Sequence, residues 1–127
     1  MGAIIVEGEV RHGRRLGGKL GFPTANIAAG GMEDIAGGVY AARAAVDGRM
    51  YEGMASLGYR PTIDPDSRER VLEVHLFGFE GSLYGRRLSV ELAKFIRPEE
   101  RFGSLDELKE AVEGDRREIE EYFKTNR

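Results

Sequence analysis

Residues 71–79 read Val-Leu-Glu-Val-His-Leu-Phe-Gly-Phe, the most strand-like stretch of the chain. β-Branched and aromatic side chains favour extended backbone, and successive side chains of a strand point to opposite faces. One face of this strand is apolar and carries Leu72, Val74 and Leu76. The opposite face carries Val71, Glu73, His75, Phe77 and Phe79, so it combines polar and aromatic side chains. In a barrel wall, one of these faces lies inside and the other outside.

Other strand patterns lie on both sides of this stretch. Residues 4–10 alternate apolar and polar side chains, which is typical of a half-buried strand, and residues 88–95 form a further strand pattern. Residues 39–46 and 49–56 are separated by Asp47-Gly48, a pair that favours a two-residue type I′ turn between antiparallel strands. Together these patterns predict five or six short strands joined by turns.

The last segment has a helical period. Ser104 followed by Glu107 forms a capping box, which marks the start of a helix. Apolar residues then recur at helical spacing: Leu105, Leu108, Val112, Ile119, Tyr122 and Phe123. Strands followed by one helix favour a small antiparallel barrel or sandwich that the helix closes at one side. We expect a single domain spanning residues 1–127.

Composition excludes several classes of protein. The formal charge is −3, from 19 basic and 22 acidic residues, which gives no support for a nucleic-acid or anionic-membrane partner. The absence of cysteine excludes disulfides, cysteine-ligated metals and thiol nucleophiles, and it fits a cytoplasmic location. Residues 1–10 contain two glutamates and no long apolar run, so we expect neither a signal peptide nor a membrane span.

Residues 11–31 are basic and rich in glycine and show no period, so we expect a long functional loop there. Gly13 to Lys19 matches most of a P-loop. Leu20 replaces the hydroxyl residue that would bind magnesium, and Pro23 prevents the helix that a P-loop requires. Glycines and cations still suit phosphate, because backbone N–H groups can approach an anion closely. A solvated loop without a ligand is the alternative.

Thr24 and Asn26 form a second candidate site within the same segment. Pro23 holds its neighbour extended, and in an extended stretch Thr24 and Asn26 point to the same side. Their hydroxyl and amide oxygens are hard neutral ligands of the kind that suits Mg²⁺. The alternative is a plain turn in which both side chains bond to local backbone.

Short motifs follow one another along the chain in a recognisable order. The first are Gly-x-Val-x-x-Gly at residues 8–13 and Leu-Gly-Phe-Pro-Thr-Ala-Asn at residues 20–26. The later ones are Gly38-Val39-Tyr40-Ala41, Gly58-Tyr59-Arg60-Pro61-Thr62, Leu72-Glu73-Val74-His75-Leu76, Leu83-Tyr84-Gly85 and Phe95-Ile96-Arg97-Pro98-Glu99, then Phe102 and Asp115. Each motif is weak alone, but their order over nearly the whole chain resembles the riboflavin kinase family.

The resemblance implies a fold and a reaction. The fold is mainly β, a six-stranded antiparallel Greek-key β-barrel with a C-terminal α-helix. The reaction is transfer of the γ-phosphate of ATP to the ribityl 5′-hydroxyl of riboflavin, giving FMN and ADP. Glu73 is then the expected catalytic base, and Thr24 and Asn26 the expected ligands of Mg²⁺ and the ATP phosphates.

The same resemblance implies further binding residues. The flavin-binding candidates are His75, Leu76, Tyr84, Arg97 and Phe102, with the flavin between the barrel and the helix. Gly13 and Lys19 are candidates for the ATP phosphates. The family usually has Gly-Arg before Leu-Gly-Phe-Pro-Thr, whereas this chain has Gly17-Gly18 followed by Lys19. Lys19 supplies a charge there but not the fork of an arginine.

Two competing hypotheses stay open on the sequence. One is a flavin-binding barrel with little or no kinase activity, motivated by the glycine in place of arginine. The other is an RNA- or protein-binding barrel, against which the acidic balance argues. We expect a monomer whose partners are riboflavin or FMN and ATP or ADP, with no nucleic acid and no membrane.

Overall fold

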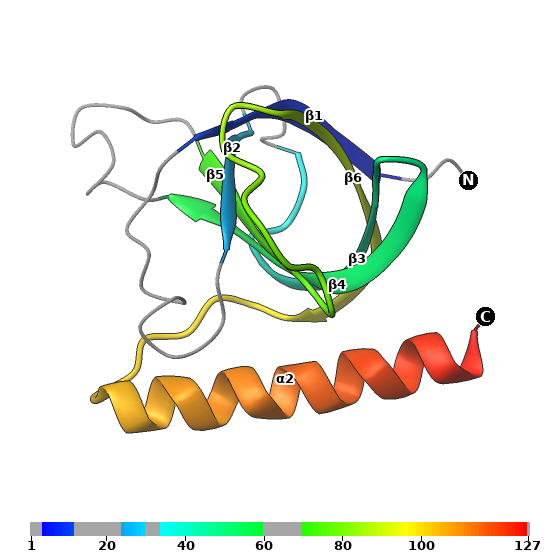
Figure 1. Ribbon diagram of the computed structural model, residues 1–127. Helices are drawn as coiled ribbons and strands as arrows, with labels where there is room; N and C mark the ends of the chain where they lie inside the picture. The colour runs from blue at the N-terminus through cyan, green and yellow to red at the C-terminus, as the bar shows by residue number, and fades with distance from the viewer. Residues whose placement is uncertain (1–3, 12–23, 30–33, 60–69, 127) are drawn as a thin grey trace.

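The computed structural model describes residues 4–11, 24–29, 34–59 and 70–126, with Tyr59 described by its backbone alone. In this part of the chain, six antiparallel strands form a closed barrel in the order β1-β2-β5-β4-β3-β6 (Figure 1). Their bounds are β1 Ile4–Arg11, β2 Ala25–Ala28, β3 Gly38–Val46, β4 Arg49–Tyr59, β5 Arg70–Leu76 and β6 Arg87–Arg97. The predicted Greek-key barrel is therefore confirmed.

The predicted hairpin between β3 and β4 is present with the expected turn. Val46 pairs with Arg49, and the two residues between them have positive φ, 52° at Asp47 and 82° at Gly48. Positive φ at both central positions defines a type I′ turn, whose twist matches that of the flanking strands.

The apolar face of β5 lies inside the barrel. Leu72 is fully buried, and Val74 and Leu76 belong to the same interior cluster. β5 ends at Leu76, three residues earlier than the apolar run suggested, because Gly78 turns the chain with φ 76°. Phe79 was expected beside Glu73, but beyond this turn it packs on the interior cluster and meets the Tyr51 ring at 5.4 Å. Phe79 thus helps to close one end of the barrel.

The expectation of a loop throughout residues 11–31 was wrong at residues 25–28. Those residues form β2, which pairs with β1 on one side and with β5 on the other. Ala25 and Ile27 point into the barrel core, so this short strand is held by burial although it lacks a long alternating pattern. β2 is the element that completes the wall between β1 and β5.

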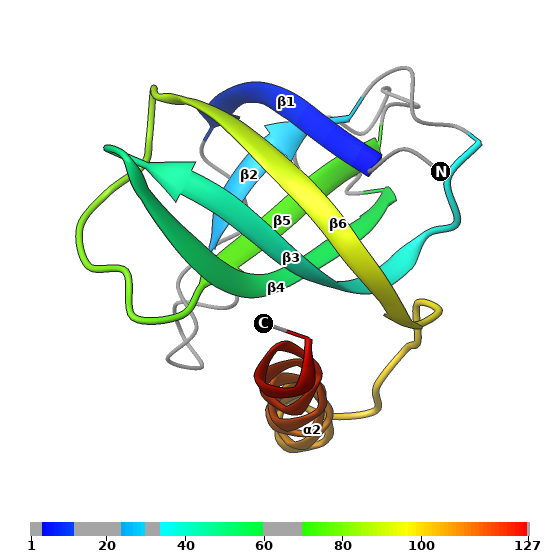
Figure 2. The ribbon, with the colours of Figure 1, turned by 90° about the vertical axis from the view of Figure 1, so that its right-hand side faces the viewer.

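Helix α2, Leu105–Thr125, lies outside the barrel against β3, β4 and β6. Figure 2 shows it nearly end-on beneath the strands. Its start is capped reciprocally, because Ser104 Oγ accepts from Glu107 N at 3.1 Å while the Glu107 carboxylate accepts from Gly103 N at 2.8 Å. Its buried residues are Asp115, Ile119 and Phe123.

A second apolar cluster joins the helix to the outer surface of the wall. Ile119 and Phe123 pack there on Val39, Ala41 and Met54. The first turns of the helix make no part of this cluster, and Leu105 is 55% exposed. Among the described residues, no helix is long and apolar enough to cross a membrane.

Candidate functional site

A row of side chains crosses the outer face of the barrel from β2 to β6. Strand pairing places Asn26 beside Glu73, and Glu73 beside Ser56. The row continues through Val39 to Arg97. The inner face of the same wall holds the barrel core, so this row lies on the outer face, where the helix packs against β3, β4 and β6.

Asn26 provides a buried oxygen at one end of the row. The residue is 4% exposed, and its side-chain Oδ1 has no hydrogen-bond partner among the described residues. A buried acceptor without a partner is costly, so such an atom indicates a missing ligand. Thr24 is half-buried just before β2, and alternation along the extended chain puts it on the same side as Asn26.

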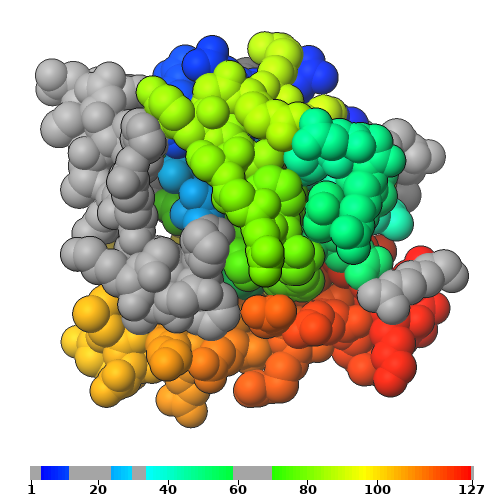
Figure 3. All heavy atoms as spheres, in the orientation of Figure 1, coloured from blue at the N-terminus to red at the C-terminus, as the bar shows by residue number. Residues whose placement is uncertain are grey.

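The chemistry of this site fits a metal ion, because a neutral oxygen that lacks a hydrogen-bond donor, such as Asn26 Oδ1, suits a hard cation. Within residues 4–11, 24–29, 34–59 and 70–126, no three histidine, aspartate or glutamate side chains gather as a metal site. A cation at Thr24 and Asn26 would therefore complete its shell with water and phosphate oxygens, as Mg²⁺ usually does. In Figure 3 the sky-blue surface of β2 is set back beside the lime-green segment that follows β5.

Glu73 is half-buried between its two cross-strand neighbours. Two residues along the strand, His75 is 8% exposed and meets the Phe77 ring edge-on at 5.5 Å. The guanidinium of Arg116, from the helix, lies 4.7 Å from the centre of the Phe77 ring. His75 thus contacts one of the aromatic residues expected on its face of the strand.

Arg97 occupies the other end of the row and binds the helix. Its Nε and Nη2 donate to the Asp115 carboxylate at 2.9 and 2.8 Å. These hydrogen bonds raise the pKa of Arg97 above its ordinary value, although partial burial opposes the shift. The guanidinium also lies 5.6 Å from the centre of the Phe102 ring. The guanidinium of Arg97, on the last strand of the barrel, therefore contacts both the helix and the segment that connects β6 to the helix.

The distance between Glu73 and Arg97 suits an elongated ligand. Glu73 and Arg97 are separated by three strand spacings, which corresponds to about 14 Å along the wall. N-terminal to the Asp115 partner of Arg97, the first turns of the helix present Leu105, which is exposed, and Leu108, which is half-buried. A ligand with a flat apolar ring at one end and a polar chain at the other would match this arrangement.

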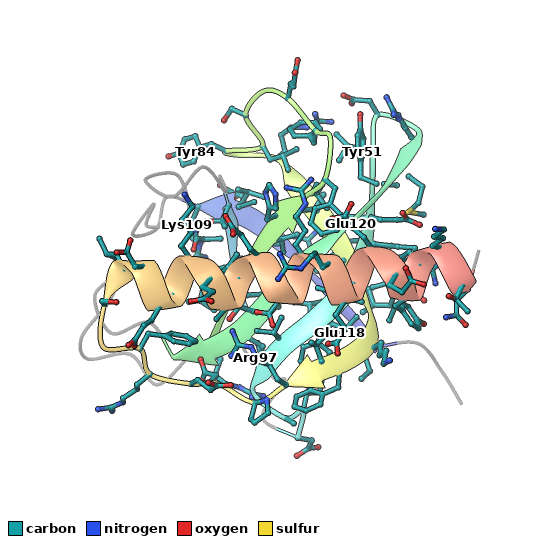
Figure 4. All side chains as sticks on the ribbon, turned by 90° about the horizontal axis from the view of Figure 1, so that it is seen from below. Tyr51, Tyr84, Arg97, Lys109, Glu118 and Glu120 are labelled. Carbon is teal, nitrogen blue, oxygen red and sulfur yellow. The ribbon has the colours of Figure 1, made fainter. Side chains whose placement is uncertain are left out.

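Several predicted residues lie apart from the row. The Leu76 side chain is in the barrel core, on the opposite face of the wall from Glu73. Tyr84 is 57% exposed on the segment after β5, and Figure 4 shows it on the other side of the helix from Arg97. Gly13 and Lys19 lie outside the described residues.

Two members of the site, Asp115 and Ser56, were given no role from the sequence. Asp115 interrupts the apolar stripe that runs through Val112 and Ile119, and a carboxylate at a buried helix position requires a cationic partner. Ser56, the neighbour of Glu73 on β4, had no local signal, because its place follows from the register of β4 against β5.

The sequence matches known proteins over most of its length. A family model described as riboflavin kinase (flavokinase) matches residues 2–123. The chain is 42% identical over 110 residues to a bifunctional riboflavin kinase/FMN adenylyltransferase of Pseudomonas fluorescens, covering 87% of this chain and 35% of that protein. A protein of the same name from Bacillus subtilis is 38% identical, with 93% and 38% covered. The chain spans little more than a third of these curated relatives.

Solved structures share the fold. A riboflavin kinase from Trypanosoma brucei superposes with a TM-score of 0.70 at 20% identity, covering 98% of this chain and 82% of that one. A Streptococcus pneumoniae structure described as a macrolide-efflux protein superposes with a TM-score of 0.77 at 31% identity. This match covers 91% of this chain and 38% of the Streptococcus pneumoniae protein.

Proposed function

The chain belongs to the riboflavin kinase family, and from this premise we propose that it transfers the γ-phosphate of ATP to the 5′-hydroxyl of riboflavin, giving FMN and ADP. The observation that carries the proposal is the pairing of Asn26 with Glu73 across β2 and β5. It sets an oxygen ligand for a metal–phosphate group beside a carboxylate that can accept a proton.

Glu73 acts as the general base in this proposal. The ribityl oxygen attacks the γ-phosphorus, the bond between that phosphorus and the bridging β,γ-oxygen breaks, and ADP leaves. The proton of the attacking hydroxyl passes to the Glu73 carboxylate. A base in such a reaction contributes about 10²–10⁴-fold to the rate, while positioning and charge neutralisation supply most of the remainder.

Thr24 and Asn26 would hold the metal and, through it, the phosphates. When bound, Mg²⁺ supplies positive charge that offsets the charge of the transferring phosphoryl group. The support in the molecule is the buried Asn26 Oδ1, which lacks a hydrogen-bond donor among the described residues. Gly13 and Lys19 keep their proposed place at the phosphates on sequence grounds alone.

The flavin ring would lie at the opposite end of the row. Phe102 offers an aromatic face, and the first turns of α2 offer an apolar floor. His75 is proposed as a wall of the same groove, and contact with Leu76 would be through its backbone because its side chain is in the core. Tyr84 would contact a ligand from the side of the helix opposite Arg97. The proposal includes a single kinase domain over residues 1–127, a monomeric state and a cytoplasmic location.

The direct test measures FMN formation from riboflavin, ATP and MgCl₂ by the native chain and by Glu73→Gln. Glutamine keeps the shape of the side chain and removes the base, so we expect the rate to fall at least about a hundredfold. Glu7→Gln is the matched control, because Glu7 is an exposed strand glutamate paired with Arg87. Its rate should equal that of the native chain.

Two results would contradict the proposal. Native protein that binds riboflavin but makes no FMN would leave a flavin-binding barrel without kinase activity. A Glu73→Gln variant with native turnover would remove Glu73 as the base. Replacing Mg²⁺ by excess chelator should abolish FMN formation, and turnover in chelator would contradict the metal assignment.

A further inference from the structure

The Arg97–Asp115 pair joins the barrel to the helix at the flavin end of the row. It lies between the last residue of β6 and the middle of α2, and the side chains are 19% and 8% exposed. Both oxygens of the carboxylate accept from the guanidinium, Oδ1 from Nε and Oδ2 from Nη2, and Nε makes a further contact with Oδ2 at 3.2 Å. Two-point pairing fixes orientation as well as distance.

The same guanidinium organises the segment that connects β6 to α2. Its Nη1 donates to the carbonyl oxygen of Pro98 at 3.2 Å, and its plane lies near the Phe102 ring. Glu100 is 3.8 Å away and exposed, so it adds little. Arg97 therefore sets the position of an aromatic ring and of a helical turn together.

Three nitrogen atoms of Arg97 donate to oxygens of the described residues. Nε and Nη2 are directed at Asp115, and Nη1 is directed at Pro98. The sequence predicts that Arg97 contacts the flavin directly, and these bonds support a second role, in which Arg97 positions other groups. A guanidinium held in this way acts on a ligand through the groups that it positions.

We propose that Arg97 and Asp115 are positioning residues for the flavin ring: their pairing fixes α2 against the barrel and holds Phe102 beside it, at the separation that a flat tricyclic ring requires. The proposal rests on the proposed kinase function and deepens it. A preorganised slot lowers the cost of ordering these groups when the ligand binds. Because Glu73 lies about 14 Å away along the wall, the pair governs riboflavin affinity and leaves the chemical step unchanged.

The test compares Asp115→Asn, Arg97→Lys and the double variant in steady-state kinetics and in riboflavin titrations without ATP. Each single variant should raise the KM and the Kd for riboflavin about tenfold or more, while kcat and the KM for ATP stay within about twofold. Because both changes break one pairing, the double variant should be no worse than the single variants. The shift of the flavin absorption band on binding should shrink in all three.

Asp47→Asn is the matched control. Arg86 and Asp47 form a similar two-point pair, with Nη2 to Oδ1 at 2.5 Å and Nη1 to Oδ2 at 3.2 Å, but on the exposed surface. This variant should keep native riboflavin affinity. Thermal melts of every variant without ligand establish that each is folded at the assay temperature.

Three outcomes would overturn the proposal. If Arg97→Lys weakens riboflavin binding and Asp115→Asn does not, Arg97 contacts the flavin directly. If kcat falls with KM unchanged, the pair serves the chemical step. If riboflavin Kd is native in both folded variants, the pair is structural alone. A native chain that binds riboflavin but makes no FMN would refute the kinase function, while the titrations would still decide the role of the pair.

Discussion

The two faces of β5 differ in what they require of their residues. The inner face carries Leu72, Val74 and Leu76 in a closed apolar core, where volume and shape decide the fit. The outer face carries Glu73 and His75, where the chemical identity of each side chain decides what the site can do. One strand thus serves stability and chemistry at alternate positions, so neighbouring substitutions should have different consequences.

The largest expected effects separate these faces at adjacent residues. Leu72→Ala, at a fully buried position, should lower the free energy of unfolding by about 2–5 kcal/mol, because it removes buried methyl groups and leaves a cavity. The folded fraction should retain native turnover. Glu73→Gln should lose activity at least about a hundredfold and keep native stability. Urea unfolding and FMN assays on both variants would check this, and a stability loss in Glu73→Gln equal to that of Leu72→Ala would remove the distinction.

Asn26→Ala, on the neighbouring strand β2, tests a buried polar residue of the outer face. Asn26 is as deeply buried as a core residue, yet its Oδ1 lacks a hydrogen-bond partner among the described residues. Removing this acceptor relieves a desolvation cost of about 1–3 kcal/mol, which offsets the lost packing, so stability without ligand should change little. The Mg²⁺ concentration for half-maximal activity should rise at least about tenfold. An unchanged metal requirement would refute the ligand role.

Tyr40, on β3, is a polar residue in the interior of the barrel, and its hydroxyl can be removed by substitution. Its hydroxyl donates to the carbonyl oxygen of Ala36 at 2.5 Å. Burial raises the pKa of Tyr40 above its ordinary 10.0, and nearby Arg70 partly opposes the shift. Stability from the neutral phenol is therefore full below pH 10 and declines as pH rises through the folded pKa.

Tyr40→Phe should lower the unfolding free energy at pH 8 by about 0.5–1.5 kcal/mol, because one hydrogen bond is lost. Between pH 9 and pH 11 the decline in stability should be shallower than in the native protein, by up to about 1.4 kcal/mol per pH unit. Urea titrations at several pH values measure both. If the unfolding free energies of the two proteins fall in parallel with pH, Tyr40 does not control the loss of stability at high pH.

The smallest effect is expected at an outer position without a ligand role. The pKa of the Asp47 carboxyl is lowered, first by the hydrogen bonds from Arg86 and then by its charge. The stabilisation is therefore present above the ordinary pKa of 3.8 and is lost as pH falls through the lower folded pKa. Because the pair is fully exposed, Asp47→Asn should leave melting at pH 7 nearly unchanged. Melting curves at pH 7 and pH 3 should differ slightly less for the variant than for the native protein.

Most of the barrel was predictable from local patterns. The alternation in residues 71–76 predicted β5 and its two faces, and Asp47-Gly48 predicted the first hairpin turn. β2 was missed because Ala25–Ala28 is too short for a pattern and is held by tertiary burial against β5. The end of β5 was misjudged because aromatic content continues past Gly78, where the backbone turns.

The site was predictable in its members and less so in their relations. Motif order identified Glu73, Asn26 and Arg97, but their common row depends on the register between strands that are distant in sequence. The partner of Arg97 could not be chosen from sequence spacing, since Asp115 is one of many acidic residues on α2. The structure identifies the partner, because Asp115 is buried whereas the other acidic residues on the helix are exposed or half-buried.

The barrel closes by pairing β1 with β6, so that Ile4 lies opposite Leu92. Strand contacts between residues so distant in sequence bring a large loss of chain entropy before they form, which slows folding. During synthesis, β1 emerges long before the strand that will cover its second edge. We therefore expect the early strands to remain an open sheet with an exposed edge until β6 is made, and the helix to dock after the ring has closed. Refolding should be slow for a chain of this size and should become native in one cooperative step.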